Sequence, residues 1–174
     1  MESKEFTTPA ALRPAYRFWS PVLLRHFYTL STAERDKLIN NYSDVWTYEQ
    51  VAYYAFATDT EPDTVPVYRF WSGTLNTHFY TANQAERDKL INNYSQAWAD
   101  EGIAFYTYPH SPGYERPIGT HPVYRLWSGS LGSHFFTASD AEMDKLLSLP
   151  TRVWEWEVYA WYAYAPVMLD RQPA

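Results

Sequence analysis

Alternating aromatic and polar positions occur in three similar blocks along the chain. In the central block, V-Y-R-F-W at 67–71 and H-F-Y-T at 78–81 are short aromatic runs, and the polar segment S-G-T-L-N-T at 72–77 separates them. Two such runs joined by a polar turn with a Gly are typical of a β-hairpin. A third aromatic run, I-A-F-Y-T-Y at 103–108, predicts one more strand in the same block.

A helix start signal lies between the predicted hairpin and the third strand. Asn83 precedes Glu86 by three residues, which is the spacing of a capping box, in which the Glu carboxylate reaches back to the N–H of the capping residue. Leu90, Ile91 and Tyr94 then form a narrow apolar stripe, as expected of a short surface helix with one face down. The other two blocks repeat the signal with Ser31 and Glu34, and with Ser139 and Glu142.

The blocks are internal repeats: we place them at 15–57, 67–108 and 123–165, with linkers at 58–66 and 109–122, in a single domain over residues 1–174. Units of this length bury their apolar faces against one another. We therefore predict a β-rich α+β fold of three β-β-α-β repeats around a pseudo-threefold axis. We expect a trefoil-like or barrel-like core with a short surface helix per repeat, and we consider an open solenoid weaker because no polar capping repeat is present.

Composition narrows the function classes. The net charge is −6 and the basic residues are scattered, so no basic stripe predicts binding of nucleic acid. The chain has no cysteine, which excludes disulfides, thiolate metal sites and a cysteine nucleophile. No apolar run approaches the ~18 residues of a membrane span or the pattern of a signal peptide, so we expect no membrane insertion and a cytoplasmic location. Extracellular action stays open, because a secreted chain with its leader removed would have a similar sequence.

Several motifs resemble a known family of three-copy repeats of uncharacterised function. These motifs are Y-R-F-W at 68–71, T-H-F-Y-T at 77–81, A-E-R-D at 85–88, and a Trp followed by E-G-I-A-F-Y at 101–106. The hallmark of the family is Y-R-[FL]-[YW] with T-H-F-Y-T, and the resemblance extends over all three copies. It implies an accessory binding role, often taken to be carbohydrate binding, and it assigns no catalytic residues. The chain departs from the pattern at Gln50, Phe136 and Met143.

The candidate site is an aromatic platform with hydrogen-bond donors on each hairpin. Alternation places Arg69 and Trp71 on one face of the first strand, and His78 and Tyr80 share a face of the second. Such a surface suits a sugar ring, which stacks on an aromatic side chain and needs directional partners for its hydroxyls. The candidate ligand-binding residues of the three copies are Arg17, Trp19, His26, Arg69, Trp71, His78, Tyr80, Arg125, Trp127 and His134.

Other interpretations of the same residues stay open. The Trp could pack under the helix while the Arg pairs with Glu101 as a structural contact. A threefold axis could bring His26, His78 and His134 together as a metal site, although no acidic partner can be assigned to them; we expect neither metal nor cofactor. Glu101 and Asp88 could serve in glycoside hydrolysis. Because each carboxylate recurs three times, whereas an active site needs one asymmetric set, we expect no enzyme.

The resulting hypothesis is a non-catalytic, lectin-like protein with up to three related weak sites on its hairpins. Several weak sites engaged together gain avidity without new contacts. We expect a glycan or glycoconjugate as the partner, and a monomer or small homo-oligomer. The alternative is a protein-interaction or structural domain, such as an inhibitor or defence protein, that uses exposed aromatic residues.

Overall fold

Three strand–strand–helix–strand units follow one another in the computed structural model, which describes residues 7–169. The first unit contains β1 (Leu12–Ser20), β2 (Arg25–Thr29), α1 (Thr32–Asn41) and β3 (Thr47–Phe56). The second contains β4 (Val65–Ser72), β5 (Thr77–Thr81), α2 (Gln84–Asn93) and β6 (Ala99–Thr107). The third contains β7 (His121–Ser128), β8 (Ser133–Thr137), α3 (Asp140–Ser148) and β9 (Glu155–Ala163), and the short helix α4 (Pro166–Leu169) follows it.

The element order agrees with the sequence prediction, but some boundaries differ. Residues 12–14, which precede the first predicted repeat, belong to β1 and pair with the end of β3. The first linker ends earlier than expected because β4 begins at Val65, and the second because β7 begins at His121. Residues 1–6 and 170–174 lie outside the described residues.

The strands form two antiparallel sheets. The first has six strands in the order β2-β1-β3-β6-β4-β5, and β3 and β6 meet in it through one residue pair, Phe56 and Tyr106. The second has three strands in the order β8-β7-β9. Isolated bridges from Tyr54 to Tyr164 and from Tyr108 to Tyr162 attach β9 to the first sheet. Over residues 7–169 the strands do not close into a barrel, so the trefoil-like or barrel-like core is not confirmed.

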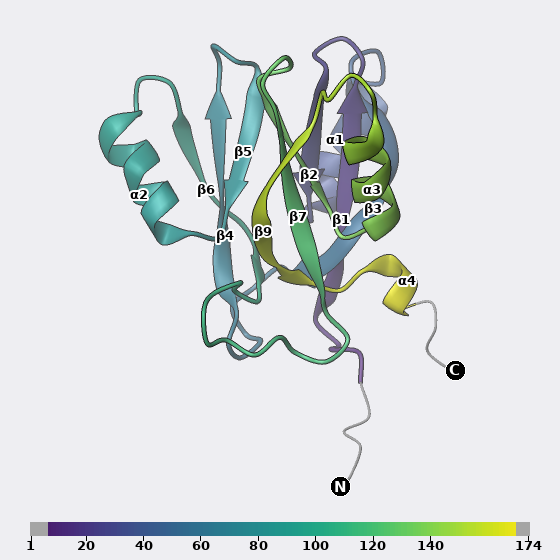
Figure 1. Cartoon of the computed structure of the whole chain (residues 1–174), viewed down its shortest axis with the longest axis vertical. Coiled ribbons are helices and arrows are strands. Elements are labelled where there is room, and N and C mark those ends of the chain that lie inside the picture. The colour runs from purple at the N-terminus through teal and green to yellow at the C-terminus, as the bar shows by residue number, and fades with distance from the viewer. Residues whose placement is uncertain (1–6, 170–174) are drawn as a thin grey trace, which may run out of the picture.

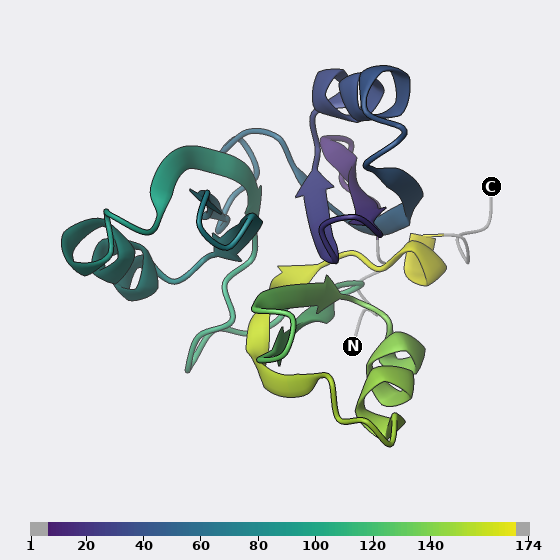
Figure 2. The ribbon, with the colours of Figure 1, turned by 90° about the horizontal axis from the view of Figure 1, so that it is seen from above.

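Each unit directs its β-sheet toward the middle of the molecule and its main helix outward (Figures 1 and 2). The middle is filled by aromatic rings, one from each unit at each level. Phe105 contacts Tyr53 and Trp161 with ring centroids 5.9 and 5.6 Å apart, and Tyr53 lies 6.1 Å from Trp161. Part of the high aromatic content of the chain is therefore used in this centre. The rings are, level by level, Tyr28, Tyr80 and Phe136; Tyr53, Phe105 and Trp161; Phe56, Tyr108 and Tyr164.

Two tyrosine hydroxyls in the centre bond to the backbone of the next unit. The hydroxyl of Tyr28 donates to the carbonyl of Phe136 at 2.9 Å and accepts from its N–H at 2.9 Å. The hydroxyl of Tyr80 makes the same two bonds to Tyr28, at 2.8 and 3.0 Å. Phe136 occupies the corresponding place in the third unit without a hydroxyl, so this unit cannot make the bonds to Tyr80.

The three main helices begin as the sequence predicts. The side chain of Asn83 accepts a hydrogen bond from the N–H of Glu86, and Ser31 and Ser139 do the same for Glu34 and Glu142. The second half of the capping box is different, since the N–H of Asn83 donates to Oγ1 of Thr81 at 2.9 Å. The hydroxyl of Thr81 in turn donates to Oε1 of Glu86 at 2.8 Å. The Glu carboxylate is thereby held beside the helix start and available to a second partner.

Candidate functional site

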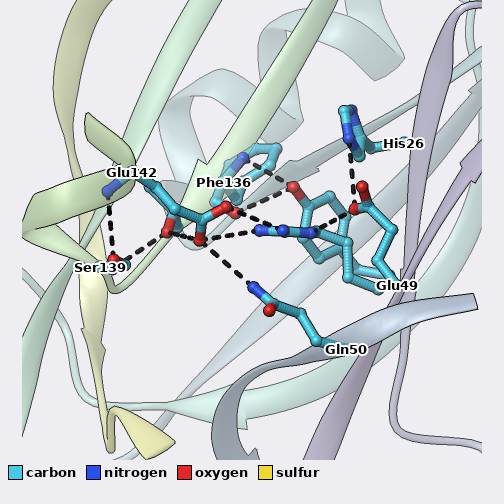
Figure 3. Close-up of polar contacts among 9 residues, drawn as sticks. His26, Glu49, Gln50, Phe136, Ser139 and Glu142 are labelled. Carbon is cyan, nitrogen blue, oxygen red and sulfur yellow. Dashed lines mark hydrogen bonds and ion pairs between the residues drawn. The ribbon is translucent and has the colours of Figure 1, made fainter. Parts of the chain in front are cut away.

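Three arginines join neighbouring units through ion pairs. Nε of Arg17 lies 2.7 Å from Glu49 on β3 of its own unit, and Nη2 lies 2.8 Å from Glu142 at the start of α3. Figure 3 shows Glu49 and Glu142 on opposite sides of this network, with Gln50 beside it. The same contacts recur around the molecule: Arg69 with Glu101 and Glu34, and Arg125 with Glu157 and Glu86.

Burial and charge act together on these groups. Burial of the Arg17 guanidinium disfavours its charge, but Tyr28, Glu142 and Glu49 outweigh this effect and raise the pKa of Arg17. Burial likewise opposes ionisation of Glu157, yet His134 and Arg125 lower the pKa of this carboxyl. The raised pKa of Arg17 and the lowered pKa of Glu157 both favour the charged forms, and the Arg–Glu contacts hold neighbouring units together. The interpretation of Arg69 as a structural partner of Glu101 is confirmed by their 2.6 Å contact.

The predicted hairpin face forms, but it faces a neighbouring unit over much of its area. Trp71 pairs with His78 across the hairpin and Arg69 with Tyr80, as alternation predicts. The Trp71 and His78 rings lie 4.7 Å apart, and His78 also contacts Phe27 of the first unit at 4.9 Å. The corresponding pairs are Trp19 with His26 and Trp127 with His134.

Exposure differs strongly along this face. The three hairpin tryptophans are half-buried, whereas Arg17 and Arg125 are buried and Tyr80 is 1% exposed. Tyr80 therefore contributes to the centre and has no surface to offer a ligand, which corrects its assignment to the platform. The Trp of each hairpin packs on the His and not under the helix. A different Trp takes the latter place in the first and third units, where Trp46 shares an apolar cluster with Leu38 of α1 and Trp154 shares one with Leu146 of α3.

A surface pocket lies between the second and third units. Its volume is about 720 Å³, and it separates the first turn of α2 from the first half of β9. We call this pocket the β9 groove and define it by Asn83, Gln84 and Glu86 on one side and by Arg125, His110, Trp156, Glu157 and Tyr159 on the other.

Two aromatic residues of β9 are among the residues that line the β9 groove. Trp156 is 45% exposed and Tyr159 is 37% exposed, and their centroids are 5.2 Å apart. His110 lies 5.2 Å from Tyr159 and also lines the groove. Exposed adjacent rings of this size are unusual away from a contact surface, because Trp and Tyr gain most from having their apolar faces covered.

The floor of the β9 groove carries the Arg125 ion pairs. Arg125 donates through Nη1 and Nη2 to the two oxygens of Glu86 at 3.0 and 3.1 Å, and through Nε to Oε2 of Glu157 at 2.8 Å. Nε2 of His134 also lies 3.1 Å from Oε2 of Glu157. Within the described part of the chain, the contacts of Glu157 with Arg125 and His134 are made through Oε2, and Glu157 itself lines the groove.

A related pocket of about 650 Å³ lies between the third and first units, which we call the β3 groove. It is bounded by the first turn of α3 and by β3, and Arg17 and Glu142 line it as Arg125 and Glu86 line the β9 groove. Its lining differs because Val51 stands where the third unit has Tyr159. The two grooves therefore share a charged floor, and the β9 groove alone of these two is lined by Trp and Tyr side chains.

The β9 groove was missed from the sequence for an identifiable reason. Residues identical in all three copies were taken as the best candidates, and these residues are largely the ones that join the units. Trp156 and Tyr159 differ from their counterparts in the other copies, and His110 lies in the second linker, outside the repeats. The available signal was the pair of aromatic residues Trp156 and Tyr159 in the third copy, where the first copy has Tyr48 and Val51 and the second has Asp100 and Ile103.

Metal binding finds no support in the geometry. Over residues 7–169, no three His, Cys, Asp or Glu side chains are placed to hold a metal ion. Each hairpin histidine lies beside a carboxylate of its own unit, as His26 does with Glu49 at 3.5 Å.

In the same part of the chain no helix has the length and apolar character needed to cross a membrane.

Comparison with known proteins gives a family and no function. No curated protein and no solved structure matches the chain. One family model matches residues 1–108, which include the first two units, and again residues 110–173, which include the third. The chain therefore belongs to the family described as Domain of unknown function (DUF5648).

Proposed function

We propose that this protein is a non-catalytic carbohydrate-binding protein and that the β9 groove is its best-developed site. The observation that carries the proposal is the pair of exposed rings, Trp156 and Tyr159, beside the polar floor of a groove of about 720 Å³. The location differs from the hairpin platform expected from the sequence. The ligand class is the same.

The chemistry of the groove matches that of a sugar. The C–H face of a pyranose covers an aromatic ring, and its hydroxyls need fixed donors and acceptors at the edge of the ring. Trp156 and Tyr159 offer the rings, Oε1 of Glu157 offers an acceptor, and Asn83 and Gln84 bring amide groups from the opposite side. The groove is also open to solvent along β9, which suits a residue within a longer glycan.

The carboxylates of the groove support binding over catalysis. Glu86 is held by Thr81 and by two donors of Arg125, and Glu157 is held by Arg125 and His134. Equivalent ion pairs occur in the other two units, where they join the repeats. A general acid needs a raised pKa, whereas the pKa of Glu157 is lowered.

We further propose that the units are three copies arranged about a pseudo-threefold axis within one domain, so that related grooves act together. The recurring Arg–Glu contacts support this arrangement, since each unit contacts the next in the same way. The β3 groove is the second candidate site. A monomer or small homo-oligomer with two or more weak sites would gain avidity on a surface that displays many glycans.

The test is a glycan array followed by solution titration of the best ligand with three variants. Trp156→Ala should weaken binding about tenfold or more, as expected for a central aromatic contact. Ile103→Ala is the matched control, because Ile103 is the equivalent of Tyr159 in the second unit and is 49% exposed. Trp71→Ala tests the hairpin location. If Trp71→Ala loses binding and Trp156→Ala keeps it, the site lies on the hairpins and not in the β9 groove.

A protein-interaction domain is the second candidate, favoured by the tips of the hairpins. Val22, Leu24 and Leu75 are 65%, 45% and 41% exposed, and Arg25 joins the first two tips by donating to the carbonyl of Leu75 at 3.1 Å. Apolar residues that gather at exposed loop tips are typical of contact surfaces. A stoichiometric protein complex that resists free sugars and is lost in Val22→Asp would favour this function over carbohydrate binding.

A further inference from the structure

The β9 groove contains one arginine, and its charge is already in use. Arg125 is 8% exposed, and its donors are directed to Glu86 and Glu157. The guanidinium also lies over the ring of Phe79, 5.3 Å from the centroid. An anionic ligand in the groove would therefore meet two carboxylates and one guanidinium that is already bonded to both of them.

No other cation compensates these carboxylates within the groove. Among the described residues that line it, Arg125 is the one Lys or Arg side chain, and the imidazole of His110 lies against Tyr159 and Tyr162. Counting Glu86 and Glu157 against Arg125, the lining carries an excess negative charge. The whole chain has a net charge of −6, so long-range attraction of anions is also absent.

We infer, on the basis of the proposed carbohydrate function, that Glu157 makes the β9 groove selective for uncharged sugars. Oε2 of Glu157, a residue of the groove lining, is fixed by Arg125 and His134, and Oε1 takes no part in these two ion pairs. A hydroxyl of a neutral sugar donates a charge-assisted hydrogen bond to this oxygen. The carboxylate of a uronic or sialic acid has no proton to donate at neutral pH and is repelled.

Matched sugar pairs test the inference. The best-binding methyl glycoside should be compared by titration calorimetry with its uronide, in which the C6 hydroxymethyl group is replaced by a carboxylate. We expect the neutral sugar to bind about tenfold more tightly at low ionic strength, which corresponds to ~1.4 kcal/mol. Because repulsion between charges is screened by salt, the ratio should fall in high salt. A ratio that stays constant would indicate a lost hydrogen bond at C6 and would overturn the role of charge.

Two variants separate Glu157 from the general charge of the protein. Glu157→Gln keeps the shape and should bring the two affinities close together. Glu155→Gln removes the same charge two residues away at an exposed position outside the groove lining and should leave the ratio unchanged. Equal or tighter binding of the uronide to the unaltered protein would overturn the inference while the carbohydrate function stood. Absence of binding to every sugar would overturn both the carbohydrate function and the inference. The salt series uses the unaltered protein, so it does not depend on whether a variant folds.

Discussion

Phe136 interrupts a series of hydrogen bonds in the centre of the molecule, and restoring the missing hydroxyl should stabilise the fold. The hydroxyls of Tyr28 and Tyr80 each bridge the N–H and carbonyl of a residue in the next unit. Phe136 stands where a third hydroxyl would reach Tyr80. We predict that Phe136→Tyr adds two hydrogen bonds between the third and second units.

The geometry indicates that the hydroxyl will fit. The rings of Phe136 and Tyr80 are 5.8 Å apart and inclined by 79°. The two bridged pairs have almost the same arrangement, at 5.6 Å and 84° for Tyr28 with Phe136 and at 5.7 Å and 82° for Tyr28 with Tyr80. The para position of residue 136 therefore points at Tyr80 as the hydroxyls of the other two point at their partners.

The magnitude follows from the net value of a buried hydrogen bond. Two bonds at a net ~0.5–1.5 kcal/mol each give a gain of about 1–3 kcal/mol. The matched variants Tyr28→Phe and Tyr80→Phe each leave a buried backbone N–H and carbonyl without the hydroxyl and should lose about 2–4 kcal/mol. For a chain of this size, each kcal/mol corresponds to about 2–4 °C in melting temperature.

Guanidinium denaturation of the four proteins at neutral pH measures these differences, with circular dichroism checking the fold. We expect the midpoint to rise for Phe136→Tyr and to fall for the two Tyr→Phe variants, with similar slopes. A lower midpoint for Phe136→Tyr would mean that the space is too small. Losses under about 0.5 kcal/mol for both Tyr→Phe variants would refute the hydroxyl bridges themselves.

Three further predictions concern the contacts between and within the units. Arg17→Met should cost about 3 kcal/mol in urea unfolding and Arg69→Met less, because their side chains are 5% and 17% exposed; equal losses would contradict the role of burial. Folding lowers the pKa of both His26 and Glu49, so the unfolded chain takes up protons first, and stability should fall as the pH drops through 6.5 and then 4.5. His26→Gln should flatten the upper part of this acid titration. An unchanged profile would show that His26 does not contribute to the pH dependence. Gly102→Ala should cost about 1 kcal/mol in thermal unfolding, since Gly102 has φ +86° in otherwise open space, and a neutral result would show that β6 relaxes there.

Local features of the fold are predictable from the sequence because they depend on neighbouring residues. Alternation gave the pairing of Trp71 with His78, and the spacing of Asn83 and Glu86 gave the start of α2. The role of Thr81 at that helix start was not predicted. Its hydroxyl takes the N–H of Asn83 in place of the Glu86 carboxylate, and this contact depends on how the end of the hairpin lies against the helix.

The arrangement of the units could not be obtained in the same way. The pairing of Arg17 with Glu142 joins residues 125 positions apart, and a repeat pattern gives no information about which neighbour each unit contacts. Retention in three copies also pointed away from the β9 groove, because contacts between units are needed three times whereas Trp156 and Tyr159 occur once. Exposure distinguishes the two kinds of residue, and only the structure supplies it.

The most direct test of the central claim is the affinity of the best array ligand for the unaltered protein and for Trp156→Ala, measured by titration calorimetry. Trp156 is 45% exposed and its ring neighbour is Tyr159, so its removal should leave the far-ultraviolet circular dichroism unchanged. We predict that affinity falls about tenfold or more, because a ring that stacks on a sugar contributes at least ~1.4 kcal/mol. Unchanged affinity in a folded Trp156→Ala protein would contradict the assignment of the β9 groove as the carbohydrate site.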